Sequence, residues 1–123
     1  PLTIVFPAAV RLSDAVTAGT GSVGIRFSAW QPLVDLLCRV GPVTGTSANR
    51  EGLPPPRTVK EVQHSLGDTL DLIIDAGPTP GGQPSTVIDV RGPIRMIRDG
   101  SIERDAIAAQ LAAHGLHLDA DSR

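Results

Sequence analysis

The chain has 123 residues, 41% of them hydrophobic, and a formal net charge of −2 at pH 7. This length supports one domain with a core but not two, and the apolar content excludes a disordered chain. The near-neutral charge and the 2% aromatic content exclude a general nucleic-acid-binding surface, so any RNA contact needs a local patch. A single cysteine, Cys38, excludes an internal disulfide. With no long apolar run either, the composition predicts a cytoplasmic protein without membrane contact.

The first third of the chain predicts two strands and a helix. Residues 2–6 form a β-branched apolar run closed by a proline, and residues 22–27 alternate, so both read as strands joined by a loop. Residues 31–40 carry leucines and valines at helical spacing, with a proline suited to the first turn. Cys38 lies among these apolar positions, and we expect it to pack in the core.

The rest of the chain predicts further strands and two helices. Thr58 and Glu61 form a capping-box pattern that begins a helix ending near Leu66, and Ser101 is placed to cap a helix that ends near His114. The runs that predict strands are 43–46, 70–75, 85–90 and 94–98. We therefore expect an α/β (α+β) fold, a twisted mixed parallel and antiparallel sheet of about six strands with packed helices. One domain should span residues 1–115, and residues 116–123 should be a frayed tail.

Two polar loops are the candidate sites. Thr46, Ser47 and Asn49 follow an apolar run, and the segment 81–86 is a glycine-rich turn that ends in Ser85 and Thr86. Hydroxyls, amides and backbone N–H groups at such places can hold a nucleotide or an amino acid. The alternative for the first loop is a capped turn, and for the second a hairpin turn before an ordinary strand.

Charged residues offer a weaker pattern. Arg26 and Arg98 lie in predicted strands, where a guanidinium can clamp a phosphate or carboxylate or can simply face solvent. Arg91 and Arg95 are expected on the surface. The three histidines lack metal-ligand spacing, and three aspartates that flank strands could hold Mg²⁺ or serve as turn residues: Asp71, Asp75 and Asp89. No motif for a nucleophile or for paired catalytic carboxylates is present.

The order of these motifs resembles the YrdC-like family, which includes the threonylcarbamoyl-adenylate synthases. The resemblance covers about residues 1–113 and rests on Pro1-Leu2-Thr3, Gly24-Ile25-Arg26, Thr46-Ser47-Ala48-Asn49, Ser85-Thr86-Val87-Ile88-Asp89 and Ile97-Arg98-Asp99-Gly100. It implies formation of threonylcarbamoyl-AMP and pyrophosphate from L-threonine, bicarbonate and ATP, with Mg²⁺, for modification of tRNA. The implied partners are tRNA or double-stranded RNA and the proteins of tRNA modification.

The resemblance also implies roles for individual residues, none of them a nucleophile. The implied ATP contacts are Thr46, Asn49 and Arg98. The implied threonine or carbamate contacts are Thr3, Arg26, Ser47 and Ser85, with Arg26 on the threonine carboxylate. These residues would therefore act by positioning the reactants and neutralising their charge.

The sequence departs from the family pattern in two places. It opens at Pro1, without the earlier stretch that carries a Lys-x-Arg pair in the family, so we expect it to represent the C-terminal two-thirds of the domain and to self-associate through an uncovered sheet. Glu51 stands where the family commonly has Ser. Two alternatives stay open: a non-catalytic nucleotide- or RNA-binding module of the same fold, and a carbamoyl-adenylating domain of a carbamoyltransferase.

Overall fold

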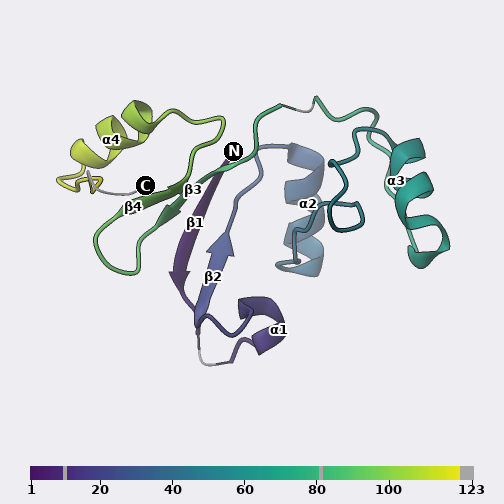
Figure 1. Ribbon diagram of the computed structural model, residues 1–123, viewed down its shortest axis with the longest axis horizontal. Coiled ribbons are helices and arrows are strands. Elements are labelled where there is room, and N and C mark those ends of the chain that lie inside the picture. Colours follow the sequence, from purple (N-terminus) through teal and green to yellow (C-terminus); the bar gives the residue numbers. More distant parts are fainter. Residues whose placement is uncertain (10, 81, 120–123) are drawn as a thin grey trace. The chain divides into compact units, whose positions relative to one another are not determined.

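A computed structural model describes residues 1–9, 11–80 and 82–119 (Figure 1). The chain forms two compact units. The first joins residues 1–42 to the segment from Gln83 onward, and the second spans Val43–Gly82. Within the described residues, no helix is both long and apolar enough to cross a membrane.

The first unit contains a four-stranded mixed sheet in the order β2-β1-β3-β4. Its strands are β1 (Leu2–Pro7), β2 (Ser22–Ile25), β3 (Thr86–Asp89) and β4 (Arg95–Arg98). The central strand β1 pairs antiparallel with β2 and parallel with β3, and β4 pairs antiparallel with β3 across a bulge. The predicted mixed parallel and antiparallel sheet is therefore confirmed.

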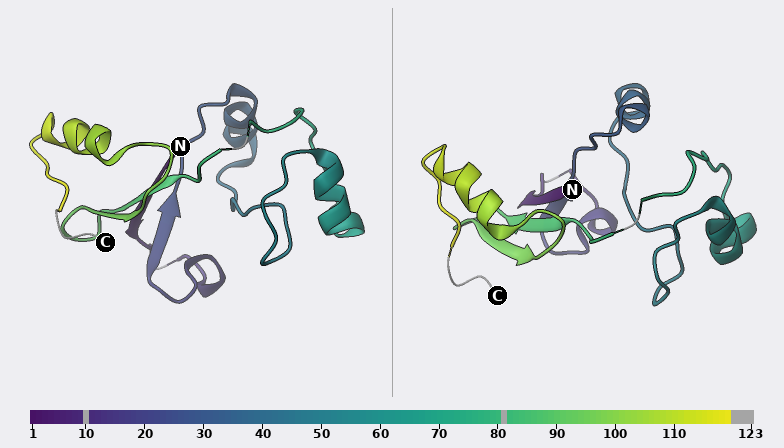
Figure 2. Two further views of the ribbon diagram at one scale, coloured as in Figure 1. Left: turned by 45° about the horizontal axis from the view of Figure 1, so that its top comes forward. Right: turned by 90° about the horizontal axis from the view of Figure 1, so that it is seen from above.

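The core of the first unit lies between this sheet and helix α4 (Arg104–Ala112), which covers one face of the strands (Figure 2). Ile88 of β3, Met96 of β4 and Ile107 of α4 are buried together. Because side chains alternate along a strand, Leu2 and Ile4 of β1 face the same core. The opposite face of the sheet carries the odd-numbered residues of β1 and β3.

Two further helices belong to the first unit. The short helix α1 (Asp14–Thr17) lies in what we predicted as a loop, and α2 (Gln31–Val40) has Pro32 in its first turn and matches its predicted range. Helix α2 has no buried residue, and Cys38 is exposed. The expectation that Cys38 packs in the core is therefore wrong, because helical spacing shows that positions share a face but not what covers that face.

The second unit contains α3 (Val59–Leu66) and the 3₁₀ turn η1 (Gly67–Thr69). The capping box is present as predicted: the Thr58 hydroxyl accepts from the Glu61 N–H, and the Glu61 carboxylate accepts from the Thr58 N–H. The Glu61 carboxylate also accepts from the Arg57 N–H at 2.6 Å. These bonds hold the pKa of Glu61 below its usual value, with the Arg57 backbone as the largest cause.

The strands predicted at 43–46 and 70–75 are absent, so the described sheet has four strands rather than about six. Neither segment is paired with a neighbouring strand, which a ladder of hydrogen bonds requires. Helix α4 begins at Arg104 with Glu103 as its N-cap, so the predicted cap at Ser101 is also wrong.

The C-terminal segment is partly anchored, contrary to the predicted frayed tail. Leu118 forms a bridge with Ile94, and the Asp119 N–H donates to the Ile94 carbonyl at 2.7 Å. Residues 120–123 of the predicted tail lie outside the described residues.

Candidate functional site

The sheet face opposite α4 gathers four of the predicted site residues. Thr3 lies on β1 in register with Val87 of β3, and its methyl group lies over Gly24 of β2, where a Cβ would approach it to 3.2 Å. Arg26 directly follows β2, and Ser85 directly precedes β3. Arg98 ends β4. Three of these residues thus lie beside strand ends at one end of the sheet, where loops leave room for a ligand.

Arg26 and Ser85 are joined by a hydrogen bond. The Arg26 Nη1 donates to the Ser85 Oγ at 3.0 Å, which ties the end of β2 to the start of β3 over the intervening β1. Arg26 is exposed, whereas Ser85 is buried. The bond uses one of the five N–H donors of the guanidinium, so the group remains able to bind a carboxylate in a fork geometry.

Arg98 also converges on Ser85, through the backbone. Its Nε and Nη2 both donate to the Ser85 carbonyl, at 3.0 and 2.9 Å. We expected Arg98 to contact ATP phosphates. The described bonds occupy two of its five donors, so a phosphate contact would have to use the others.

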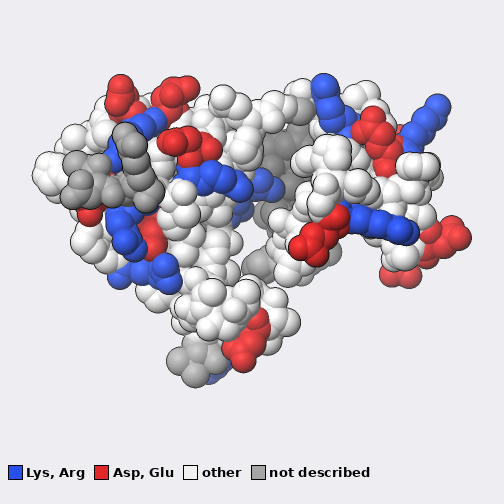
Figure 3. Space-filling view, viewed as in Figure 1, with Lys and Arg blue, Asp and Glu red and all other residues white. Residues whose placement is uncertain are grey.

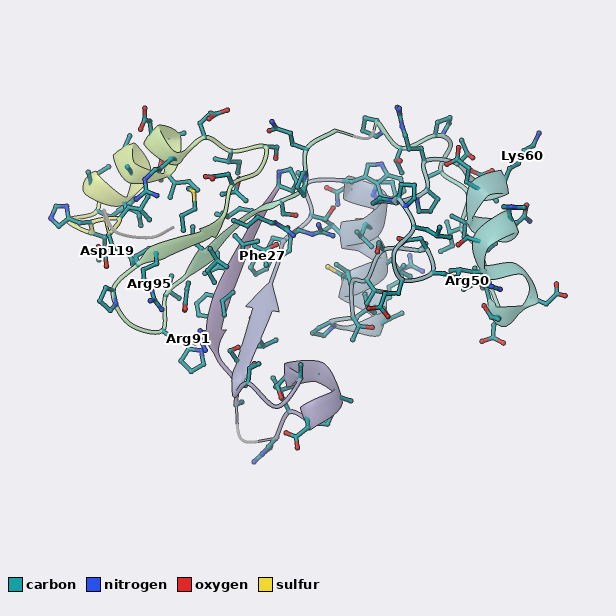
Figure 4. All side chains as sticks on the ribbon, viewed as in Figure 1. Phe27, Arg50, Lys60, Arg91, Arg95 and Asp119 are labelled. Atoms are coloured by element: carbon teal, nitrogen blue, oxygen red, sulfur yellow. The ribbon has the colours of Figure 1, made fainter. Side chains whose placement is uncertain are left out.

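An ion cluster at the β3–β4 turn joins Asp89, which we expected to hold Mg²⁺ or to serve as a turn residue, to Arg91 and Arg95, which we expected on the surface (Figure 4 labels the two arginines). Asp89 is 2% exposed and accepts from Arg91 through both oxygens, at 2.9 and 2.8 Å, while the Arg95 Nη2 lies 3.4 Å from its Oδ2. The Arg91 side-chain bond, followed by the Arg91 backbone bond, holds the pKa of Asp89 far below its usual value, and Asp89 raises the pKa of Arg91. Two features of the sequence could have indicated this cluster. One is the Asp-x-Arg spacing of Asp89 and Arg91, and the other is the hairpin that brings Arg95 opposite Asp89.

In the second unit, Asn49 lies in a turn with a defined amide orientation. Its Nδ2 donates to the carbonyls of Arg50 and Leu53, at 2.9 and 2.8 Å. Two carbonyl acceptors require the NH₂ group on that side, so Oδ1 points away from them. Within the described part of the chain, Oδ1 is buried without a hydrogen-bond partner. A buried acceptor in this condition is suited to an N–H donor from a ligand.

The other predicted residues of this loop, Thr46 and Ser47, are exposed, as is Glu51. Gly81, which opened the second predicted loop, lies outside the described residues. The described residues contain no cluster of three His, Cys, Asp or Glu side chains arranged to hold a metal. The predicted residues thus form one group in the first unit, made of Thr3, Arg26, Ser85 and Arg98, and one in the second, made of Thr46, Ser47 and Asn49.

Positive and negative side chains are interspersed in both units on the face shown in Figure 3. The described charges on that face therefore form no continuous basic surface of the kind that nucleic-acid binding by charge alone requires.

Comparison with solved structures shows which known folds this chain resembles. The structure matches that of P. abyssi Sua5 complexed with L-threonine with a TM-score of 0.82 and 26% identity, over 100% of this chain and 38% of that one. It matches the H234A/Y235A form of P. abyssi Sua5 with a TM-score of 0.81 and 31% identity, over 89% of this chain and 34% of that one. The YrdC-like fold is therefore confirmed.

Sequence comparison gives the same result. The threonylcarbamoyl-AMP synthase of Photobacterium profundum is 42% identical over 90 residues, 72% of this chain and 48% of the relative. That of Bacillus subtilis is 34% identical over 121 residues, 96% of this chain and 34% of the relative. The chain thus spans half the length of these relatives or less. Residues 1–100 match the Sua5/YciO/YrdC family model, described as "Telomere recombination". On this match and these identities, the chain belongs to the Sua5/YciO/YrdC family and is homologous to threonylcarbamoyl-AMP synthases.

Proposed function

We propose that this chain is part of an L-threonylcarbamoyladenylate synthase, in which it binds L-threonine and ATP. The convergence of Arg26 on Ser85 at 3.0 Å carries the proposal. It places an exposed guanidinium and a hydroxyl together, in a frame that overlies P. abyssi Sua5 complexed with L-threonine. The proposed purpose of the product is tRNA modification, as the resemblance to the synthases implies.

The proposed reaction has two steps. The threonine amine combines with bicarbonate and loses water, which gives an N-carboxylated threonine. A carboxylate oxygen of this carbamate then attacks the α-phosphorus of ATP, and the bond to the β-phosphate breaks as pyrophosphate leaves. Both reactants are anions, so the protein must align them and neutralise their charge, and no protein nucleophile is needed.

The residues of the first unit would hold threonine. Arg26 would pair with the threonine carboxylate, because a guanidinium matches a carboxylate in both charge and geometry. Ser85 and Thr3 lie on the same face of the sheet, where their hydroxyls would contact the threonine side chain or its carbamate. Arg98, through the donors that do not bond Ser85, would contact phosphate.

The residues of the second unit would contribute to the ATP site. The buried Oδ1 of Asn49 needs an N–H donor, and an adenine amino group is a donor of that kind. Thr46 and Ser47, which precede Asn49 in the chain, have exposed hydroxyls that would contact ATP and threonine, respectively. Mg²⁺ would accompany the ATP phosphates as part of the substrate, since phosphate oxygens and water are its usual ligands.

The test is calorimetry on the protein that carries this sequence, titrated with L-threonine and with ATP in bicarbonate buffer. Arg26→Lys keeps the charge but loses the fork, so threonine should bind at least about tenfold more weakly, the range for one lost bond to a charged group. Asn49→Ala should weaken the binding of ATP by a factor in the same range. Arg39→Lys, an exposed position on α2, is the matched control and should change neither affinity. Equal effects of the two lysine variants would contradict the assignment of Arg26.

One alternative function keeps support from an observation. The chain spans half the length of its relatives or less, so a module that binds nucleotide without turnover remains compatible with the Asn49 loop. Calorimetry separates the two proposals, because a nucleotide-binding module binds ATP without requiring Arg26 or L-threonine.

A further inference from the structure

The position of Ser85 is fixed by a segment that connects β4 to α4 and contacts both neighbours of Ser85 in the chain. This segment, residues 99–102, passes the start of β3, and its Ile102 packs against the core that α4 covers. The Ser101 N–H donates to the Pro84 carbonyl at 3.0 Å, immediately before Ser85. The segment therefore bonds directly to the backbone that presents Ser85.

Thr86 of β3 contacts this segment through its side chain. Its side chain is 0% exposed, and its hydroxyl donates to the Ile102 carbonyl at 2.8 Å while accepting from the Ile102 N–H at 2.9 Å. The Thr86 hydroxyl thus pairs both backbone polar groups of Ile102, its N–H and its carbonyl, which would otherwise need partners in the backbone. Because buried backbone groups are costly to leave unpaired, these two bonds fix the position of Thr86 and of the residue that precedes it.

Gly100 makes the close approach possible. A Cβ atom at this position would overlap the Thr86 nitrogen, the Pro84 carbonyl oxygen and the Ser85 carbonyl carbon. All three are backbone atoms, so any side chain at residue 100 would have to push the Pro84–Thr86 backbone away. The glycine is needed for close packing here rather than for a left-handed backbone.

We propose that Gly100 and Thr86 are positioning residues that hold Ser85 so that its hydroxyl orients the Arg26 guanidinium for substrate binding. Neither residue is proposed to touch substrate, since Thr86 lies on the buried side of the strand from which Ser85 faces outward. A change in the position of Ser85 affects Arg26 through the 3.0 Å hydrogen bond between them, because a shift of the Ser85 hydroxyl weakens that bond. This inference rests on the proposed threonine-binding function of Arg26.

The experiment compares Thr86→Val with Thr86→Ser in the protein that carries this sequence. Valine has nearly the shape of threonine but no hydroxyl, so both Ile102 bonds are lost, whereas serine keeps them. L-threonine should bind about tenfold more weakly to the valine variant and with nearly unchanged affinity to the serine variant. Ser85→Ala should weaken binding to a similar extent.

The double variant distinguishes positioning from general damage to the fold. If Thr86 acts through Ser85, then Thr86→Val combined with Ser85→Ala should bind L-threonine no more weakly than Ser85→Ala alone. Additive losses, or equal affinity of the valine and serine variants, would overturn the proposal. If the valine variant fails to fold, Thr86→Ala replaces it, because the smaller side chain leaves room for water to bond Ile102.

A second readout does not depend on ligand binding. In ¹H–¹⁵N spectra, the Arg26 Nε–H signal should shift in the valine variant and stay in place in the serine variant. If the wild type binds no L-threonine but this shift is seen, the proposed function fails and the positioning stands. If the wild type binds L-threonine and the signal does not move, the positioning fails and the proposed function stands.

Discussion

Asp89 is the most deeply buried ionisable side chain among the described residues, and its two arginine partners explain how the sheet tolerates it. Arg91 meets both carboxylate oxygens, its backbone N–H meets one of them, and Arg95 approaches the other. A buried carboxylate is stable only when its charge is paired and its oxygens are hydrogen-bonded. The cluster therefore fixes the turn between β3 and β4, on the strand whose start carries Ser85.

Stability should depend on pH through Asp89. The pKa of Asp89 is far below its usual value, so its contribution to stability is complete above about pH 4 and is lost as pH falls through the lower folded-state pKa. Asp89→Asn should lower the melting temperature at pH 7, and the difference from the wild type should shrink below pH 4. Thermal melts from pH 2 to pH 7 measure this. Asp105→Asn, an exposed position in α4, is the control. A constant difference at all pH values would contradict the assignment to Asp89.

Individual site residues were predictable to different degrees. The motifs pointed to Arg26 and Ser85, and the structure brings these two residues together. The use of Arg98 on the Ser85 carbonyl was not predictable, because a backbone acceptor leaves no trace in the sequence. The role of Gly100 was missed for the same reason: a close approach between segments depends on packing that no local pattern encodes.

Among the elements, the predicted strands that have a partner are present, and the two predicted strands that have none are absent. Residues 43–46 and 70–75 contain apolar and β-branched side chains, yet Val43, Leu72 and Ile74 are exposed. An extended apolar run becomes a strand only when another strand completes its hydrogen bonds, so β propensity alone overcounts strands. The capped helix α3 was predicted well, since its signal lies within four consecutive residues.

Strand β4 allows a test of the register of the sheet. Met96 is 5% exposed and packs against Ile107, whereas its neighbour Ile97 is 56% exposed. Met96→Ala should lower the free energy of unfolding by about 2–5 kcal/mol, and Ile97→Ala by about 1 kcal/mol or less. Urea denaturation of both variants measures the difference. A larger loss at Ile97 would show that β4 is shifted by one residue, since such a slip exchanges the two faces.

For the whole molecule, the predicted fold class holds, but its division into units was not foreseen. In the second unit, Val43–Gly82, no described residue is buried as a whole, although the Oδ1 atom of Asn49 is. It lies in sequence between β2 and β3, which pair with the same strand β1. The composition did carry a sign of the second boundary, because residues 77–84 contain three glycines and three prolines, a density typical of segments between compact units.

We expect the 123-residue chain on its own to form no measurable threonylcarbamoyl-AMP. It spans half the length of its relatives or less, and the family resemblance assigns part of the charge neutralisation to the rest. Even one missing donor to a transition state costs about 2.7–4 kcal/mol. Pyrophosphate release with ATP, L-threonine and bicarbonate measures turnover, with the Photobacterium profundum relative as the positive control. Turnover at the rate of that relative would show that the residues present here are sufficient.

The same chain should self-associate through the uncovered side of its sheet. Strand β2 forms one edge of the described sheet, and Phe27, two residues beyond its end, is 90% exposed (Figure 4). Light scattering over a range of concentrations measures the association, and Phe27→Ser should reduce it. A monomer at all concentrations would contradict this expectation.

The parallel pairing of β1 with β3 has a consequence for the order of folding. Leu2 must meet Thr86 across most of the chain, while β1 with β2 and β3 with β4 form from neighbouring segments. Closing so long a loop costs entropy before the parallel contacts can compensate for it, so the two hairpins should form first and their joining should limit the rate. Substitutions in the turn between β3 and β4 should then slow refolding, because that hairpin is formed in the transition state and is not stable by itself. Substitutions in the seam between Ile4 and Ile88 should slow refolding in part and speed unfolding in part, because these contacts complete only after the two hairpins have met.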